Sequence, residues 1–286
     1  FPAGDTVERV PPLLAVGAHL KNSVALSVGE QVFVSQHIGD LETAEAYRAF
    51  ENVLNDLMRL YEVVPEVVGC DLHPDYLSTK KAREFNTPVV AIQHHYAHIL
   101  SCMAENEVAP PVLGISWDGT GLGTDGTIWG GEFLLVNETS YRRIGHLRQF
   151  SLAGGDAAVR EPRRSALGLL YQAYGEKCFD MQSLAGDVFT TNELTVLCGM
   201  LVNKVNTIPT SSAGRLFDAV ASLLGLCHKT TYEGEAAMAL EFAIAGAQTE
   251  DVYPFEIGEN ESILILDWQP MLAELLADRD RGVPTS

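Results

Sequence analysis

The stretch VLGISWDGTGLGTDGTIWGGEFLLV, residues 112–136, decides how this chain folds. It begins with an apolar strand pattern at 112–116 and ends with another at 127–136. The glycine- and threonine-rich segment between them, DGTGLGTDG at 118–126, is predicted to be a turn. Backbone amides and hydroxyls in such a turn can bind phosphate oxygens. The turn lacks the GxxxxGK of a P-loop, and a strand rather than a helix follows it, so it is not a GxGxxG dinucleotide turn either. A flexible hairpin without a ligand is the alternative.

The chain upstream shows the same order of elements. Strands are expected at 13–17, 25–29 and 31–36, followed by an amphipathic helix over 41–62. From residue 112 the order is again strand, turn, strand, strand and helix, with the third strand at 141–150 and the helix at 163–175. This repetition, which carries no residue identity, predicts two related lobes with a central cleft, as in the duplicated α/β fold of actin-like ATPases. A single irregular α/β domain is the alternative.

The rest of the pattern sets the expected domain boundaries. Helices are predicted at 193–206, 211–226 and 233–246, an exposed helix at 269–282, and a single late strand at 263–268. Because the second half shows no pair of late parallel strands, the second lobe is expected to be incomplete. We therefore expect a linker at 1–12, a first lobe at 13–111 and a second lobe at 112–286 that lacks its C-terminal part.

Composition narrows the functional class. The chain has 286 residues, 47% of them hydrophobic, and a net charge of −19. The charge argues against a broad nucleic-acid-binding face. No apolar run reaches the ~18–20 residues of a membrane span. The five cysteines are scattered and form no CxxC, which favours reduced thiols and a cytoplasmic location.

A histidine cluster, AIQHHYAHILSCMAEN at 91–106, precedes the decisive stretch. On a helix, His94 and His98 face the same way and can bind one metal ion, whereas His95 points elsewhere. The apolar face of this helix is predicted to consist of Ala97, Leu100, Met103 and Ala104. The pattern is not HExxH, which excludes a zinc protease of that kind. A purely structural histidine pair is the alternative.

A metal needs further ligands, and Asp118 at the end of the next strand can supply one. Two imidazoles and a carboxylate with open positions suit iron or zinc. A cation is also expected here because Asp118 and Asp125 would otherwise repel a phosphate bound at the turn.

Longer blocks of sequence resemble one family. HHYAH, WDGTGLGTDGTIWGGEFLLV and GRLFDAVASLLGL, together with LKNSVAL, SQHIGDLETAEA, DLHPDYLST and LAGGDAAVREPRRSA, resemble the C-terminal carbamoyltransferase region of the hydrogenase maturation factors HypF. The resemblance runs from about Leu13 to the end of the chain. It implies the duplicated actin-like (RNase H-like) fold, shared with antibiotic O-carbamoyltransferases and with the TsaD-like enzymes that make threonylcarbamoyl-adenosine in tRNA.

The resemblance also implies an activity. Such proteins use ATP and carbamoyl phosphate, and their upstream acylphosphatase-like, zinc-finger and YrdC-like domains make carbamoyl-adenylate. The C-terminal region passes the carbamoyl group to the C-terminal cysteine of the partner HypE, on the way to the cyanide ligand of nickel–iron hydrogenase. An O-carbamoyltransferase acting on a small-molecule hydroxyl and a non-catalytic nucleotide-binding or docking fragment stay open as alternatives. A sugar kinase is the weakest, since HxxxH has no role there.

Carried over onto this sequence, the family's site residues fall on three groups. The metal ligands are His94, His98 and Asp118, for iron or zinc. Lys21 would meet a phosphate or the carbamoyl oxygen as a catalytic residue. The nucleotide contacts would be Gly119, Thr120, Gly121, Asp125, Gly126 and Thr127 in the turn, Asp218 at the ribose, and Glu233 with Gly234 at the base or ribose. The family's SGG-type turn and late Asp–Gly–Gly segment, which supplies another metal ligand, are not found, so the metal site is expected to be incomplete.

Overall fold

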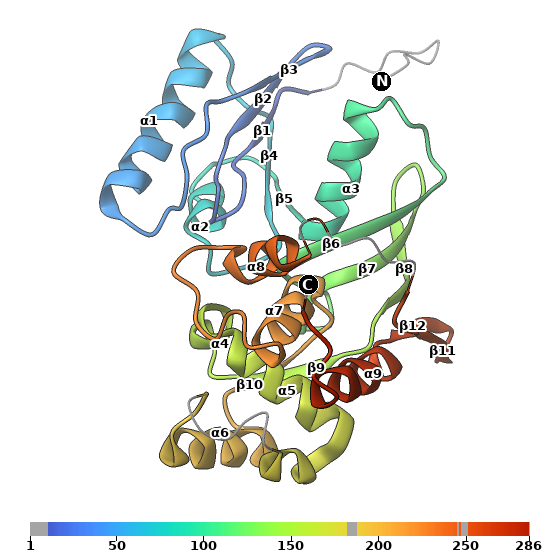
Figure 1. Cartoon of the computed structure of the whole chain (residues 1–286). Helices are drawn as coiled ribbons and strands as arrows, with labels where there is room; N and C mark the ends of the chain where they lie inside the picture. Colours follow the sequence, from blue (N-terminus) through green and yellow to red (C-terminus); the bar gives the residue numbers. More distant parts are fainter. Residues whose placement is uncertain (1–10, 182–187, 245, 247–250, 286) are drawn as a thin grey trace. The chain divides into compact units, whose positions relative to one another are not determined.

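A computed structural model describes residues 11–181, 188–244, 246 and 251–285 of this chain (Figure 1). The chain divides into two compact units, Phe1–Val108 and Ala109–Ser286, each with its own sheet. The linker expected at 1–12 lies almost entirely outside the described residues, and its assignment stays a prediction. Among the described helices, none is long and apolar enough to cross a membrane.

The first unit contains a five-stranded sheet of order β3-β2-β1-β4-β5. β1 runs antiparallel to β2 and parallel to β4, and β4 runs parallel to β5. The carboxyl ends of β1, β4 and β5 therefore lie at the same edge of the sheet, where ligands collect in α/β proteins. The strands are β1 Leu13–Ala15, β2 Ala25–Val28, β3 Gln31–Val34, β4 Val67–Asp71 and β5 Val89–Ile92.

Three helices accompany this sheet: α1 Ala44–Leu60, α2 Leu77–Ala82 and α3 His94–Glu105. α1 begins at Thr43, whose side chain accepts the amide of Ala46 at 3.1 Å, and it buries Phe50 and Leu54 in the core of the unit. α3 begins where the side chain of Gln93 accepts a backbone amide.

The apolar face predicted for the histidine helix is wrong. α3 buries His95 and Ile99, whereas Ala97 and Ala104 are exposed. The error arises because the prediction counted only apolar side chains. The ring of His95 is buried with its Nδ1 atom 3.0 Å from the side-chain Nε2 of Gln93, and this hydrogen bond allows a polar ring on the inner face.

The second unit opens with the same three-strand arrangement as the first. β7 runs antiparallel to both β6 and β8, as β2 does to β1 and β3. The duplicated fold predicted from the repeated pattern is thereby confirmed. The described strands of this unit are β6 Val112–Leu122, β7 Ile128–Val136, β8 Tyr141–Leu147, β9 Phe150–Ala153, β10 Thr207–Thr210, β11 Glu256–Asn260 and β12 Ile263–Asp267. They form one sheet of order β11-β12-β8-β7-β10-β9, to which β6 is added by pairing with β7.

Several strand predictions in this unit need correction. The glycine-rich turn is shorter than predicted, since β6 continues through it to Leu122. The single strand expected at 141–150 is two strands, β8 and β9. β10 and β11 were not predicted because TIPT contains a proline and EIGEN is polar and fully exposed, so neither shows an apolar alternation. β12 is therefore not the only late strand.

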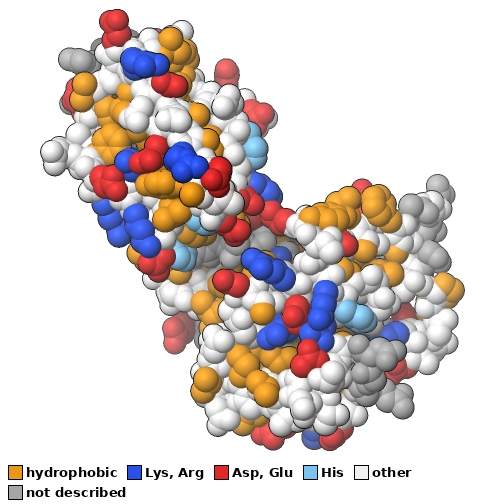
Figure 2. Space-filling model, turned by 90° about the vertical axis from the view of Figure 1, so that its left-hand side faces the viewer, with side chains coloured by type: hydrophobic (Ala, Val, Ile, Leu, Met, Phe, Trp, Pro, Cys, Tyr) orange, Lys and Arg blue, Asp and Glu red, His pale blue; other side chains and the backbone are white. Residues whose placement is uncertain are grey.

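Helix α5 lies in the main core of the second unit, where it buries Leu167, Leu169 and Leu170. The helix at the end of the chain was expected to be exposed, and this is wrong: α9 buries Met271, Leu272, Leu275 and Leu276 in the same core. The described helices are α4 Asp156–Arg160, α5 Pro162–Tyr174, the 3-10 helix η1 Gly175–Asp180, α6 Thr191–Asn203, α7 Ala213–Leu223, α8 Glu235–Ala243 and α9 Gln269–Asp280. On the face shown in Figure 2, basic side chains lie among acidic ones.

Candidate functional site

A cavity of about 250 Å³ lies in the first unit at the carboxyl ends of β1, β4 and β5. Asp71, His94 and His98 line it together with the small residues Gly17 and Gly69. Asp71 ends β4, and His94 is the first residue of α3, directly after β5. These polar side chains meet because the carboxyl ends of the parallel strands β4 and β5 lie at the same edge of the sheet.

The two histidines predicted as metal ligands come together within this unit. The Nε2 atoms of His94 and His98 are 3.2 Å apart. Two nitrogens that each lie ~2.0–2.1 Å from one tetrahedral ion are separated by about 3.3 Å. The spacing of this pair therefore fits a shared divalent ion. The rings are almost perpendicular, at 82°.

Asp71 was not predicted as a site residue. Its Oδ2 atom lies 2.8 Å from Nδ1 of His94, and its Oδ1 atom accepts the amide of His73 at 2.8 Å. A carboxylate on Nδ1 keeps that nitrogen protonated and leaves Nε2 as the electron-pair donor, which is the usual arrangement behind a metal-binding histidine. The only signal in the sequence was a carboxylate at the end of a buried strand, in VVGCD.

In the second unit, the glycine-rich segment begins with a β-bulge. The register of β6 against β7 shifts between Trp117 and Gly121, so residues 118–120 leave the regular ladder. The Oδ1 atom of Asp118 accepts the amide of Gly119 at 2.6 Å. The bulge changes the direction of the backbone at the first of the residues that were predicted to bind phosphate.

The start of α7 packs against this bulge. Ser212, the N-cap residue of α7, donates its hydroxyl to the carbonyls of Asp118 and Gly119 at 2.7 and 2.9 Å. A Cβ atom placed on Gly214 would lie 2.7 Å from Cα of Gly119. Glycine at 214 therefore permits a close approach of the helix N-terminus, which favours anions, to the glycine-rich segment.

The tip of the hairpin is held by Asp125. Its Oδ1 atom accepts from the Thr127 amide, the Thr127 hydroxyl and the Trp129 indole at 2.7–3.0 Å, and its Oδ2 atom pairs with Arg143 at 3.0 Å. Burial raises the pKa of the Asp125 carboxyl, but these hydrogen bonds and the Arg143 charge outweigh burial and hold it below its usual value. Oδ1 is thus engaged within the hairpin and Oδ2 by Arg143 on β8, and Gly126 at the hairpin tip has a φ of +77°. A direct contact of Asp125 with nucleotide stays a prediction.

The remaining predicted residues lie elsewhere in the two units. Asp218 is buried on α7 and forms an ion pair with Arg215 at 3.0 Å. Burial raises the pKa of Asp218 to about 6, although the Arg215 charge lowers it. Gly234, with φ +81°, precedes α8, and Glu233 beside it is exposed. Lys21 is exposed in the first unit, and its amide donates to Asp40 at 2.8 Å.

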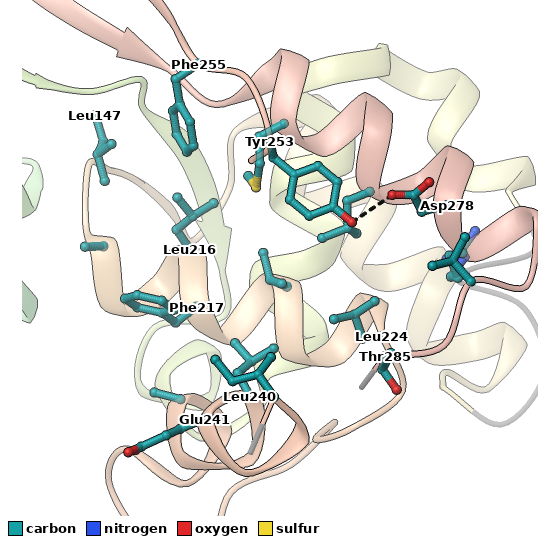
Figure 3. Close-up of a pocket in the computed structure, with 18 of the residues that line it drawn as sticks. Leu147, Leu216, Phe217, Leu224, Leu240, Glu241, Tyr253, Phe255, Asp278 and Thr285 are labelled. Atoms are coloured by element: carbon teal, nitrogen blue, oxygen red, sulfur yellow. Dashed lines mark hydrogen bonds between the residues drawn. The ribbon is translucent and has the colours of Figure 1, made fainter. Parts of the chain in front are cut away.

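A larger cavity in the second unit is apolar. It has a volume of about 960 Å³ and is lined by side chains of α7, α8 and α9 together with Tyr253 and Phe255 (Figure 3). The hydroxyl of Tyr253 donates to Asp278 at 2.9 Å across one end. None of the predicted site residues lines this cavity. Its apolar lining does not suit the phosphates of a nucleotide.

Known protein families match almost the whole chain. The HypF Kae1-like domain matches residues 8–105, and the second subdomain of the carbamoyltransferase Kae1-like domain matches residues 114–286. The chain belongs to the HypF carbamoyltransferase family. The resemblance inferred from the sequence blocks is confirmed.

Relatives of this HypF-family chain are named carbamoyltransferases. It is 42% identical over 280 residues to carbamoyltransferase HypF of Synechocystis sp., covering 93% of this chain and 36% of that protein. It is 37% identical over 280 residues to a carbamoyltransferase HypF homolog of Cupriavidus necator, covering 95% of this chain and 70% of that one. The chain thus spans about a third of the length of the first of these.

A solved structure gives the same fold. The crystal structure of full-length HypF in a phosphate- and nucleotide-bound form matches with a TM-score of 0.91 and 36% identity, covering 98% of this chain and 36% of that one. The structure of T. kodakarensis HypF matches with a TM-score of 0.84 and 31% identity. The actin-like α/β fold class is therefore confirmed.

Proposed function

We propose that this HypF-family chain is a carbamoyl-transfer domain, which passes a carbamoyl group from carbamoyl-adenylate to a thiol of a partner protein. The observation that carries the proposal is the pair of imidazole nitrogens 3.2 Å apart at a strand-end cavity, in a chain whose relatives are named carbamoyltransferases. This arrangement suits a reaction in which a polarised carbonyl is attacked.

The first part of the proposal concerns the metal. His94, His98 and Asp118 are its ligands, with Asp71 holding the His94 ring by its Nδ1 atom. Neutral imidazole nitrogens and a carboxylate oxygen suit iron or zinc. Such an ion, when bound, supplies Lewis acidity at the carbamoyl oxygen.

The second part concerns ATP and the adenylate formed from it. The residues from Gly119 to Thr127 bind the phosphate, supported by the N-terminus of α7, whose amides and dipole favour an anion. Asp218 binds the ribose hydroxyls, and Glu233 with Gly234 lies against the base or ribose. A solved HypF relative in a phosphate- and nucleotide-bound form supports a nucleotide as the substrate class.

The third part concerns the transfer itself. The thiolate of the acceptor attacks the carbamoyl carbon, a C–S bond forms, the C–O bond to the phosphate breaks, and AMP leaves with the electron pair. Lys21 balances negative charge on the phosphate or the carbamoyl oxygen. No covalent intermediate on this chain is needed, because the acceptor brings its own nucleophile.

The acceptor is the C-terminal cysteine of HypE, and upstream acylphosphatase-like, zinc-finger and YrdC-like domains supply the adenylate. We place the reaction in the cytoplasm, in agreement with the scattered free cysteines.

The proposal is tested by supplying carbamoyl-adenylate and HypE to the metal-loaded chain. We expect AMP release and a carbamoylated HypE cysteine, measured by chromatography and by mass spectrometry. AMP release that requires an aminoglycoside-type hydroxyl acceptor instead of HypE would favour an O-carbamoyltransferase. Binding of HypE without AMP release would favour a docking role.

The raised pKa of Asp218 predicts a pH dependence of nucleoside binding. Since this pKa is about 6, Asp218 is ionised above that pH and protonated below it. An ionised carboxylate accepts hydrogen bonds from both ribose hydroxyls. The protonated carboxyl group has one oxygen that carries a proton, so it is a poorer acceptor for the two hydroxyls. The affinity for adenosine, which has no titrating phosphate, should therefore fall several-fold from pH 7 to pH 5 in calorimetric titrations. Asp218→Asn should bind weakly and lose this dependence, and a wild-type affinity that does not change with pH contradicts the ribose assignment.

A further inference from the structure

Arg143 on β8 joins three separate segments of the second unit. Its Nε atom donates to Oε2 of Glu132 on β7 at 2.6 Å. One terminal nitrogen donates to Oδ2 of Asp125 at the hairpin tip at 3.0 Å, and the other donates to the hydroxyl of Ser211 at 3.2 Å. Only 11% of the Arg143 side chain is exposed, so the guanidinium is held by these partners rather than by water.

The partner carboxylate on β7 is wholly buried. Glu132 has no exposed surface, and its second oxygen accepts from the Ser211 hydroxyl at 2.5 Å and from the amides of Gly130 and Gly131 at 3.2 and 3.4 Å. A buried carboxylate is stable only when it is paired and hydrogen-bonded. Glu132 and Arg143 therefore depend on each other, and together they fix the glycines that precede Glu132.

The same guanidinium also packs on an aromatic ring. The central carbon of Arg143 lies 4.1 Å from the ring centroid of Trp129, whose indole nitrogen donates to Asp125 at 2.9 Å. Stacking and hydrogen bonds thus connect five side chains into one network. We call this network the Arg143 clamp; it consists of Asp125, Trp129, Glu132, Arg143 and Ser211. Ser211 directly precedes Ser212, which caps α7 and binds the carbonyls of Asp118 and Gly119. The clamp therefore connects the hairpin tip to the start of α7.

We propose that Arg143 is a positioning residue for the nucleotide-binding hairpin, an inference that rests on the nucleotide site of the proposed function. It acts through Asp125 and Ser211 and does not touch the nucleotide. The turn carries carboxylates that would repel phosphate, and Arg143 is the cation that neutralises Asp125. It also holds the glycine-rich segment against α7 before a ligand binds. This lowers the loss of conformational entropy on binding.

The clamp needs arginine rather than any cation. The guanidinium directs separate N–H groups at Glu132, Asp125 and Ser211, and its flat face lies on Trp129. A lysine carries the same charge but offers one ammonium group and no planar fork. Arg143→Lys should therefore keep the pairing with Glu132 and lose the connection to the hairpin tip.

Two variants test the clamp, with the neighbouring exposed arginine as the matched control. Arg143→Lys keeps the charge, and the double variant Glu132→Gln with Arg143→Met removes both buried charges together. Arg142→Met is the control on the same strand. For each we would measure thermal unfolding, ATP affinity by calorimetry, and amide hydrogen exchange over 119–131 without ligand. The expected result is an ATP affinity lowered about tenfold or more in both variants, as misplacement of binding groups predicts, with faster exchange over 119–131 and a control that behaves as wild type.

The measurements distinguish a failure of the clamp proposal from a failure of the proposed nucleotide site. An ATP affinity within twofold of wild type in a folded double variant overturns the proposal, and so does wild-type hydrogen exchange in Arg143→Lys. If the double variant does not fold, Arg143→Lys alone decides. If the wild-type chain binds no ATP, the nucleotide site fails, while faster exchange over 119–131 in Arg143→Lys still supports the clamp and unchanged exchange overturns it.

Discussion

Replacing both His94 and His98 by alanine should remove divalent-metal binding from this chain. Their Nε2 atoms lie 3.2 Å apart, so both can bind one ion, and the loss of both leaves no imidazole in the cavity. Bound iron or zinc should fall from about one ion per chain to background, because at most one carboxylate ligand remains of a set that normally has three protein ligands. The number of bound metal ions per chain, measured by elemental mass spectrometry after metal loading and desalting, tests this prediction.

Graded variants locate the contributions within the site. Asp71→Asn keeps both imidazoles but loses the carboxylate on Nδ1 of His94, and we expect metal affinity to drop by about 10–100-fold. Asp118→Asn should weaken binding if Asp118 is a ligand. His37→Ala, which removes an exposed histidine of the same unit, is the control. Full metal content in the double alanine variant would show that the histidines are a structural pair, and an unchanged affinity in Asp118→Asn would remove that residue from the ligand set.

Features set by short stretches of chain could be predicted from the sequence. His94 and His98 meet because four residues make about one helical turn, and this needs no knowledge of the rest of the fold. The alternation of VLGIS and the glycines that follow likewise specify a strand that runs into a hairpin. The repeated order of these local patterns indicated the duplicated architecture but left a single irregular α/β domain open, and the resemblance to the HypF family decided between them.

Features that depend on contacts between distant segments could not be predicted. Asp71 acquires its role from a histidine 23 positions later, and the Ser211 hydroxyl meets Glu132 across 79 positions. Helix α9 was expected to be exposed, yet its four buried side chains pack on the core around α5. Spacing within one element carries no information about these partners. For the same reason Arg143 reads as one more basic residue in YRRIGHLRQF.

Replacing Gly214 by alanine should disturb the glycine-rich hairpin at 118–127 and destabilise the chain. The added Cβ would lie 2.7 Å from Cα of Gly119 and 3.3 Å from the carbonyl oxygen of Asp118. These are backbone atoms, so relief requires the start of α7 to move away from the bulge in β6. Overpacking of this kind costs about 1–3 kcal/mol of stability. Moving the helix N-terminus should also weaken ATP binding by about tenfold or more.

The matched control is Gly199→Ala in α6, where a new Cβ meets no atom within 4 Å. Alanine is a better helix former than glycine, so this variant should gain up to about 1 kcal/mol in urea unfolding. The same chemical change is therefore expected to have opposite signs at these two helical glycines, because only the Cβ at 214 meets the bulge in β6. Equal stabilisation by Gly214→Ala and Gly199→Ala would mean that the start of α7 is not in close contact with the bulge in β6. Destabilisation of Gly214→Ala with full ATP affinity would mean that the phosphate binds away from the start of this helix.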